Sequence, residues 1–198
     1  MRLVISCMDY RLTEFLMRIS REDDLIFRNA GADAYGIQGS LSALTGVSEI
    51  LYLPHNDCAA HKLAFKLLKG QETASESIRR RLTAHLQGLR LTSEEELMRV
   101  NVERNVRLLK DLFPKASMEV KTVDVYKLNW PIRKPIVYYA KSTTRYSEDM
   151  IGAYLLQSTT KDDVSIDLEI ALQKLGIREF REIENNEDQP LRKAAKRD

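Results

Sequence analysis

Three short apolar runs near the start of the chain constrain its fold more than any other feature. They are residues 2–6 (RLVIS), 25–28 (LIFR) and 49–54 (EILYLP), and each is apolar at nearly every interior position. Strands that are buried on both faces have this character, and they occur in parallel sheets covered by helices. Helical segments are expected between and after the runs, at 13–18, 37–47 and 58–68. Strands alternating with helices predict an α/β fold, with a mainly parallel central sheet flanked by helices.

The rest of the chain is expected to continue this pattern. Thr92 and Glu95 have the spacing of a capping box, which marks the start of a helix, and Pro114 marks its end. The arginine run Arg79–Arg81 is interpreted as the solvated face of another helix. The remaining expected elements are a helix over 71–91, a long helix over 93–112, strands over 118–128 and 136–140, and helices over 147–157 and 165–175.

The character of the sequence changes after Trp130, and this predicts three segments. Residues 1–133 are expected to form the α/β domain. Residues 134–184 are expected to form an extension, with a strand and two helices, that packs on the core or on a partner subunit. Residues 185–198 are charged and poor in apolar side chains, so we expect them to be disordered.

Composition argues against several classes of protein. The net charge of +2 is too small to indicate a nucleic-acid partner by itself. No apolar run approaches the roughly 20 residues that a membrane-spanning helix needs. Strand-like sequence follows Met1 almost at once, so a secretory leader is not indicated. The chain has only two cysteines, which argues against a disulfide framework. We therefore expect a cytoplasmic protein that binds neither nucleic acid nor membranes.

Both cysteines lie at the ends of predicted strands, among residues that can bind a metal. Cys7 follows the first run, His55 follows the third, and Cys58 falls in the first turn of the next helix. Functional groups gather beyond the carboxyl ends of strands in such sheets, so these three side chains are expected to converge. Two thiolates and an imidazole can bind zinc and leave one tetrahedral position open. His61 stays open as a further ligand, and a purely apolar role for each cysteine is the alternative.

Asp9 and Arg11 follow Cys7 at alternate positions of the loop that leaves the first strand. On one side of that loop they can form a charge-assisted, bidentate pair. A free carboxylate beside the metal would oppose ionisation of a bound water, and Arg11 offsets that charge. Asp9 could also leave Arg11 and occupy the open metal position, which would switch the site off. The alternative is a surface ion pair of little consequence.

These motifs resemble those of one family. Cys7-x-Asp9-x-Arg11, RNAGA at 28–32 and His55-x-x-Cys58 are similar, in order and spacing, to the motifs of the β-class carbonic anhydrases. The resemblance covers residues 2–130 and implies a β-carbonic anhydrase-like fold. It implies Zn²⁺ bound by both cysteines and His55, with Asp9 and Arg11 as the catalytic dyad. The implied reaction is reversible hydration of CO₂ to bicarbonate and a proton, by a homodimer or higher homo-oligomer.

The resemblance also bears on residues outside the ligand set. It implies that Asn29, Ala30 and Gly31 lie near the metal, and Ala59 stands where the family usually has glycine. His61 is a candidate proton shuttle, with an exposed helix histidine as the alternative description. Because the first expected strand starts almost at Met1, we expect this protein to lack the helical arm that usually precedes the family's first strand. We hypothesise that the extension covers the surface that this arm would otherwise occupy.

Two other functions stay open at this stage. A hydrolase of a CO₂ analogue, CS₂ or COS, would use the same zinc site. A catalytically inactive zinc-binding protein would act as a sensor or interaction module. The sequence decides neither the choice among these nor the size of the oligomer beyond a dimer.

Overall fold

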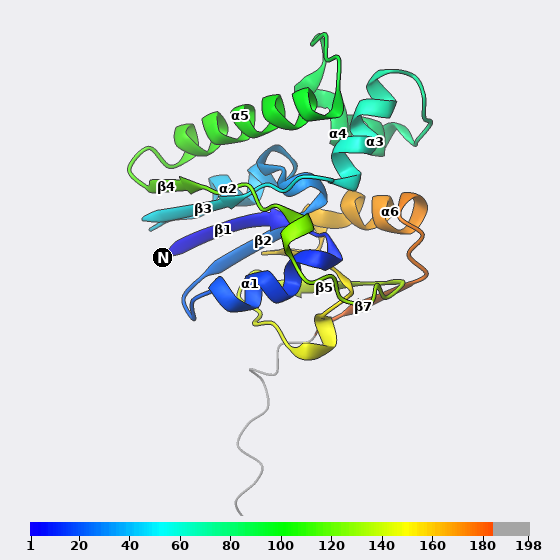
Figure 1. Cartoon of the computed structure of the whole chain (residues 1–198). Helices are drawn as coiled ribbons and strands as arrows, with labels where there is room; N and C mark the ends of the chain where they lie inside the picture. Colours follow the sequence, from blue (N-terminus) through cyan, green and yellow to red (C-terminus); the bar gives the residue numbers. More distant parts are fainter. Residues whose placement is uncertain (184–198) are drawn as a thin grey trace, which may run out of the picture.

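Seven strands form a single sheet in the computed structural model, which describes residues 1–183 (Figure 1). The strand order is β4-β3-β1-β2-β6-β5-β7, and each neighbouring pair is parallel except β2 and β6. The predicted α/β fold with a mainly parallel sheet is therefore confirmed. The strands are β1 (Arg2–Cys7), β2 (Leu25–Asn29), β3 (Glu49–Leu53), β4 (Ser117–Val120), β5 (Ile136–Lys141), β6 (Tyr154–Ser158) and β7 (Glu179–Glu182).

Helices cover both faces of the sheet. The helix α1 lies on one side, and α3, α4 and α5 lie on the other (Figure 1). Right-handed crossovers from β1 to β2 and from β3 to β4 require this arrangement. The helix α6 contacts α4 and so belongs to the second layer. The helices are α1 (Thr13–Ile19), α2 (Gln38–Ser42), α3 (Ala59–Leu68), α4 (Glu76–Thr83), α5 (Glu94–Leu112) and α6 (Ser165–Lys174).

The strand β1 lies between β2 and β3, at the point of the sheet where a ligand site is expected. It pairs with β2 on one side and with β3 on the other, in register Ser6↔Arg28 and Ser6↔Leu53. The chain therefore changes direction across the sheet at β1, and ligand crevices form beyond the carboxyl ends of strands at such a point. All five residues of β2 are buried, as the apolar run predicts.

The expected helix over 147–157 is wrong. The structure has a short 3-10 turn at Glu148–Met150 and then strand β6. Gly152 has φ +83°, and a Cβ there would collide with the carbonyl oxygen of Ile132, so a helix cannot continue through it. All five residues of β6 are buried, and a short apolar run of this kind does not distinguish a strand from a buried helix.

Several other expected elements are shorter than predicted. The strand expected over 118–128 is β4 followed by an isolated bridge at Val123 and a 3-10 turn. The helices expected over 37–47 and 71–91 are limited to α2 and α4. The cap of α5 is Ser93, whose hydroxyl accepts from the backbone N–H of Glu96, one residue later than the predicted box.

The extension is part of the same sheet. Within 134–183 it contributes β5, β6, β7 and α6, where one strand and two helices were predicted. Its strand β6 meets β2 through the pair Arg28↔Gln157, and the N–H of Leu155 donates to the carbonyl oxygen of Met8 at 3.0 Å. The predicted tail, 185–198, lies outside the described residues. Within residues 1–183, no helix has the length and apolar character to span a membrane.

Arg81 corrects the interpretation of the arginine run. Its guanidinium lies between the carboxylates of Asp33 and Asp167, at 2.6 and 2.9 Å, and its side chain is only 6% exposed. The residue therefore joins α4 to α6 and to the loop after β2, and it does not belong to a solvated face. The sequence shows charge, but it does not show that two distant carboxylates face the same side of this helix.

Candidate metal centre

The three predicted ligands converge because of the positions of β1 and β3. Cys7 is the last residue of β1, His55 follows β3 by two residues, and Cys58 is the N-terminal cap of α3. Since β1 and β3 are parallel neighbours, their carboxyl ends meet at one edge of the sheet. The ligand atoms of the three residues all lie within 4.8 Å of one another, and all three side chains are buried.

The geometry fits a zinc ion. The two cysteine sulfurs are 3.9 Å apart. Two thiolates at the usual 2.3 Å from a tetrahedral zinc would be separated by about 3.8 Å. One imidazole completes three ligands, and a fourth position stays open for a small molecule, as in catalytic zinc sites.

His55 presents a free nitrogen to the two sulfurs. Its Nδ1 is 2.7 Å from the carbonyl oxygen of Asn56, and because a carbonyl only accepts, Nδ1 carries the proton. The other nitrogen, Nε2, is buried and has no hydrogen-bond partner. A carbonyl that fixes the tautomer in this way is the usual support of a metal-bound histidine. The unpartnered Nε2 is therefore a lone pair directed at the candidate metal.

The two thiols are electrostatically different. The contact with the Cys7 thiol lowers the pKa of Cys58 despite its burial. The backbone N–H groups of Ala60 and His61, at the start of α3, lower it further. The same contact and burial raise the pKa of Cys7. The surroundings therefore make Cys58 the more readily ionised of the two thiols, and a bound cation would favour ionisation of both.

Asp9 and Arg11 form the predicted bidentate pair. Arg11 Nε donates to Asp9 Oδ1 at 2.9 Å, and Nη2 donates to Oδ2 at 2.7 Å. Asp9 Oδ2 is also 4.0 Å from His55 Nε2, so the pair lies beside the candidate metal position. Burial opposes ionisation of Asp9, but hydrogen bonds from Arg11 outweigh it and lower the pKa of the carboxyl.

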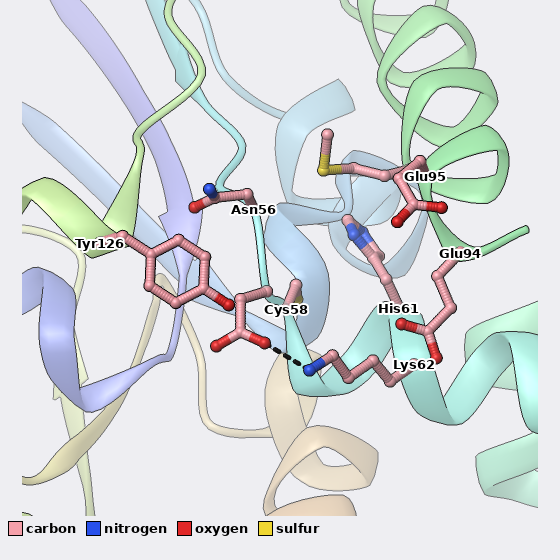
Figure 2. Close-up of a pocket in the computed structure, with 9 residues that line it drawn as sticks. Asn56, Cys58, His61, Lys62, Glu94, Glu95 and Tyr126 are labelled. Carbon is pink, nitrogen blue, oxygen red and sulfur yellow. Dashed lines mark hydrogen bonds and ion pairs between the residues drawn. The ribbon is translucent and has the colours of Figure 1, made fainter.

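Asp57 is a site residue that the sequence analysis missed. It lies inside the His55-x-x-Cys58 motif and contacts Arg11 through both its carboxylate and its backbone carbonyl. It also lines a pocket of about 380 Å³ beside the candidate metal position. Figure 2 shows Tyr126 and Asn56 on one side of this pocket and side chains from α3 and the start of α5 on the other. The motif spacing alone gave no signal of this contact.

The residues of the RNAGA motif form the end of β2 and a hydrogen-bonded loop after it. Asn29 is bonded to the backbone of Asp33 through both ends of its amide, which closes the loop. The N–H of Ala30 donates to Asp167 at 3.2 Å. Gly31 has φ +81°, and a Cβ there would lie 3.2 Å from His61 Nε2, so the position favours glycine on both counts. None of the three lines the pocket that Cys58 borders.

Ala59 and His61 both lie on α3 just after Cys58, and His61 lines the same pocket as Cys58. Ala59 lines a separate hollow with Lys66 and Lys174. The description of His61 as an exposed helix histidine is wrong, since the residue is only 7% exposed. Its Nε2 lies 3.0 Å from the side-chain amide of Asn101. Burial lowers the pKa of His61 to about 4.

Comparison with known proteins gives matches among solved structures only. No protein-family model matches the chain, and no curated protein does. Among solved structures, the chain is similar to a carbonic anhydrase from Glaciozyma antarctica, with 23% sequence identity and a TM-score of 0.42. The match covers 64% of this chain and 79% of that chain. A likeness of this size carries no functional argument, so the residues of the site must carry it.

Proposed function

We propose that this protein is a zinc-dependent enzyme that reversibly hydrates CO₂ to bicarbonate and a proton. The observation that carries the proposal is the unpartnered Nε2 of His55, which faces two cysteine sulfurs and an Asp9 oxygen 4.0 Å away. A purely structural zinc site would not need a buried carboxylate–arginine pair beside it. The resemblance of the sequence motifs to β-class carbonic anhydrases supports the same reaction.

The residues of the chain have distinct parts in this proposal. Cys7, His55 and Cys58 would hold the zinc, which when bound supplies an acidified water as a nucleophile for an electrophilic carbon. Asp9 Oδ2, 4.0 Å from His55 Nε2, would accept a hydrogen bond from a water or hydroxide held beside these ligands. Arg11 keeps that carboxylate ionised and fixes its direction through two parallel hydrogen bonds.

The alternatives predict different substrates or none. A hydrolase of CS₂ or COS would use the same groups, and relative turnover of the three gases separates it from a CO₂ hydratase. An inactive zinc-binding protein would carry zinc with no turnover of any of them. The homodimer or higher oligomer and the cytoplasmic location stay predictions, to be checked by sedimentation and by fractionation.

A proton-shuttle role for His61 also stays a prediction. Its burial and its pKa of about 4 keep the ring neutral near pH 7, which is unfavourable for carrying protons. If it acts as a shuttle, His61→Ala lowers turnover in weak buffer, and strong imidazole buffer restores it. Equal turnover of the variant and the wild type in both buffers would exclude the role.

The first experiment is stopped-flow CO₂ hydration on protein of measured zinc content, beside Asp9→Asn. Fast turnover by the wild type and a loss of about 10²-fold or more in the variant, at equal zinc content, would support the proposal. Asp111→Asn is the matched control, because Asp111 is exposed on α5, far along the sequence from the motifs. Full zinc occupancy without turnover from pH 7 to 9 would contradict a CO₂ hydratase.

A further inference from the structure

Asp57 has an unusual backbone for its residue type. Its φ is +52°, in the left-handed region that residues other than glycine seldom adopt, although aspartate and asparagine tolerate it best. This conformation turns the backbone carbonyl and the side chain of Asp57 toward the same neighbour. Arg11 Nη1 donates to Asp57 Oδ2 at 2.7 Å, and Nη2 donates to the Asp57 carbonyl at 3.0 Å.

Arg11 is consequently held from two sides. Asp9 takes its Nε and Nη2, and Asp57 takes its Nη1 and shares Nη2. The indole ring of Trp130 lies 4.8 Å from the guanidinium carbon and covers it. The Arg11 side chain is 6% exposed. With every guanidinium nitrogen bonded, Arg11 has one orientation, and that orientation fixes the carboxylate of Asp9.

The second oxygen of Asp57 connects this pair to the pocket. Asp57 Oδ1 accepts from the ammonium of Lys62, an ion pair drawn as a dashed line in Figure 2. Charges of alternating sign therefore run from the buried Asp9 through Arg11 and Asp57 to Lys62, whose side chain is 45% exposed. The buried end of this chain lies beside the candidate metal, and its outer end lines the pocket.

We propose that Asp57 is a positioning residue that acts through Arg11. It completes the hydrogen bonds of the guanidinium, so that Asp9 Oδ2 is held beside the candidate metal position, 4.0 Å from His55 Nε2. The catalytic part of this inference rests on the proposed function, because only turnover reports the direction of Asp9. The holding of Arg11 by Asp57 does not depend on any activity.

The variant Asp57→Asn distinguishes the positioning of Arg11 from a purely structural role of Asp57 in the turn before α3. Asparagine has the same shape and accepts the left-handed backbone, so the turn before α3 is retained. What is lost is the carboxylate that binds Arg11 and Lys62. We therefore expect zinc content, measured by mass spectrometry, and the unfolding midpoint to match those of the wild type and of the exposed control Asp111→Asn.

The first readout is independent of catalysis. In protein labelled with ¹⁵N-arginine and loaded with zinc, the guanidinium N–H signals of Arg11, assigned by their loss in Arg11→Lys, report exchange with water. We expect exchange at least about tenfold faster in Asp57→Asn, because one side of the guanidinium loses its charged acceptor. Exchange at the wild-type rate would show that Asp57 does not hold Arg11, and would overturn the proposal whatever the activity.

The second readout is the kinetic consequence. We expect Asp57→Asn to lower kcat about tenfold with KM for CO₂ unchanged, and to have less than a twofold effect in an Asp9→Asn background. Equal losses in both backgrounds, or wild-type kcat with fast exchange, would overturn the positioning role. If the zinc-loaded wild type hydrates no CO₂, the proposed function fails. The exchange measurement then still decides whether Asp57 holds Arg11.

Discussion

Two buried arginines, Arg11 and Arg28, contact the segment Cys7–Asp9, and they use their guanidinium groups differently. Arg11 binds the carboxylates of Asp9 and Asp57. Arg28 is fully buried and binds neutral acceptors: the carbonyl oxygens of Cys7 and Asp9, at 3.0 and 2.9 Å, and the hydroxyl of Thr13 at 2.9 Å. Within residues 1–183, no carboxylate lies within ion-pair distance of Arg28.

The two kinds of hydrogen-bond acceptor give Arg11 and Arg28 different structural roles at the same site. Carboxylate partners set the charge beside the candidate metal and fix the direction of Asp9. Carbonyl partners fix the backbone that carries Cys7 and Asp9, because each hydrogen bond holds a peptide plane. A buried cation without a carboxylate is costly, so these three charge-assisted hydrogen bonds must offset its desolvation. The ring of Tyr146, with its centroid 5.7 Å from the guanidinium carbon, adds a cation–π contact from the extension.

The largest effect is expected at Arg28. Arg28→Met removes the charged donor of the Cys7 carbonyl and the Thr13 hydroxyl, and it leaves the Asp9 carbonyl with the N–H of Leu12 alone. We therefore expect the free energy of unfolding to fall by about 4 kcal/mol. The backbone of a metal ligand loses its support as well, and zinc affinity should fall at least about tenfold. Denaturant titration and competition with a chelator measure the two changes.

Two further variants show which property of Arg28 causes the changes in stability and zinc affinity. Arg28→Lys keeps the charge but not the planar fork, so it should recover only part of the loss. Arg107→Met, at an exposed position of α5, controls for the loss of an arginine. If Arg28→Met unfolds and binds zinc like this control, the carbonyl contacts do not support the site, and the contrast between the two arginines fails.

The second prediction uses Arg81, which also binds two carboxylates but lies away from the candidate metal. Burial, with Asp33 nearby, raises the pKa of Asp167 to about 6, although Arg81 and the N–H of Ala30 oppose the shift. A carboxyl with a raised folded pKa binds its proton more tightly in the native state than in the unfolded state. Its contribution therefore favours folding below the unfolded pKa and is lost as pH rises through about 6.

The size of that loss follows from the shift from 3.8 to about 6. It corresponds to about 2 kcal/mol between pH 4 and pH 7. Comparing denaturant unfolding of the wild type with that of Asp167→Asn across this range isolates the contribution, because other titrating groups are common to both. Parallel pH profiles of the two proteins would show that Asp167 titrates near its ordinary pKa.

The sequence was sufficient for the parts of the site that depend on strand ends. Apolar runs located β1 and β3, and their parallel pairing brought Cys7, His55 and Cys58 together as expected. The sequence was insufficient where the hydrogen-bond partner of a side chain is a backbone atom or a residue far along the chain. Arg28 binds carbonyls, which no residue letter shows, and Asp167 meets Ala30 across 137 positions.

The same reason explains the errors in the extension. The apolar run of β6 is compatible with either a buried strand or a buried helix. The φ of +83° at Gly152 excludes a helix, and the sequence does not show this backbone conformation or the Ile132 carbonyl that lies close to it. Asp57 was missed because its role depends on a left-handed backbone that the motif spacing does not reveal.

The smallest effect is expected where the extension meets Arg28. The hydroxyl of Tyr146 lies 3.0 Å from Gln157 Oε1, while its ring covers the guanidinium. Tyr146→Phe keeps the ring and loses one hydrogen bond, so we expect about 1 kcal/mol of destabilisation and unchanged zinc affinity. Tyr146→Leu also loses the cation–π contact and should cost about 1 kcal/mol more, with a measurable fall in zinc affinity. If neither variant changes zinc affinity while Arg28→Met does, the guanidinium acts on the ligand loop through its carbonyl contacts alone, and the extension contributes only to folding.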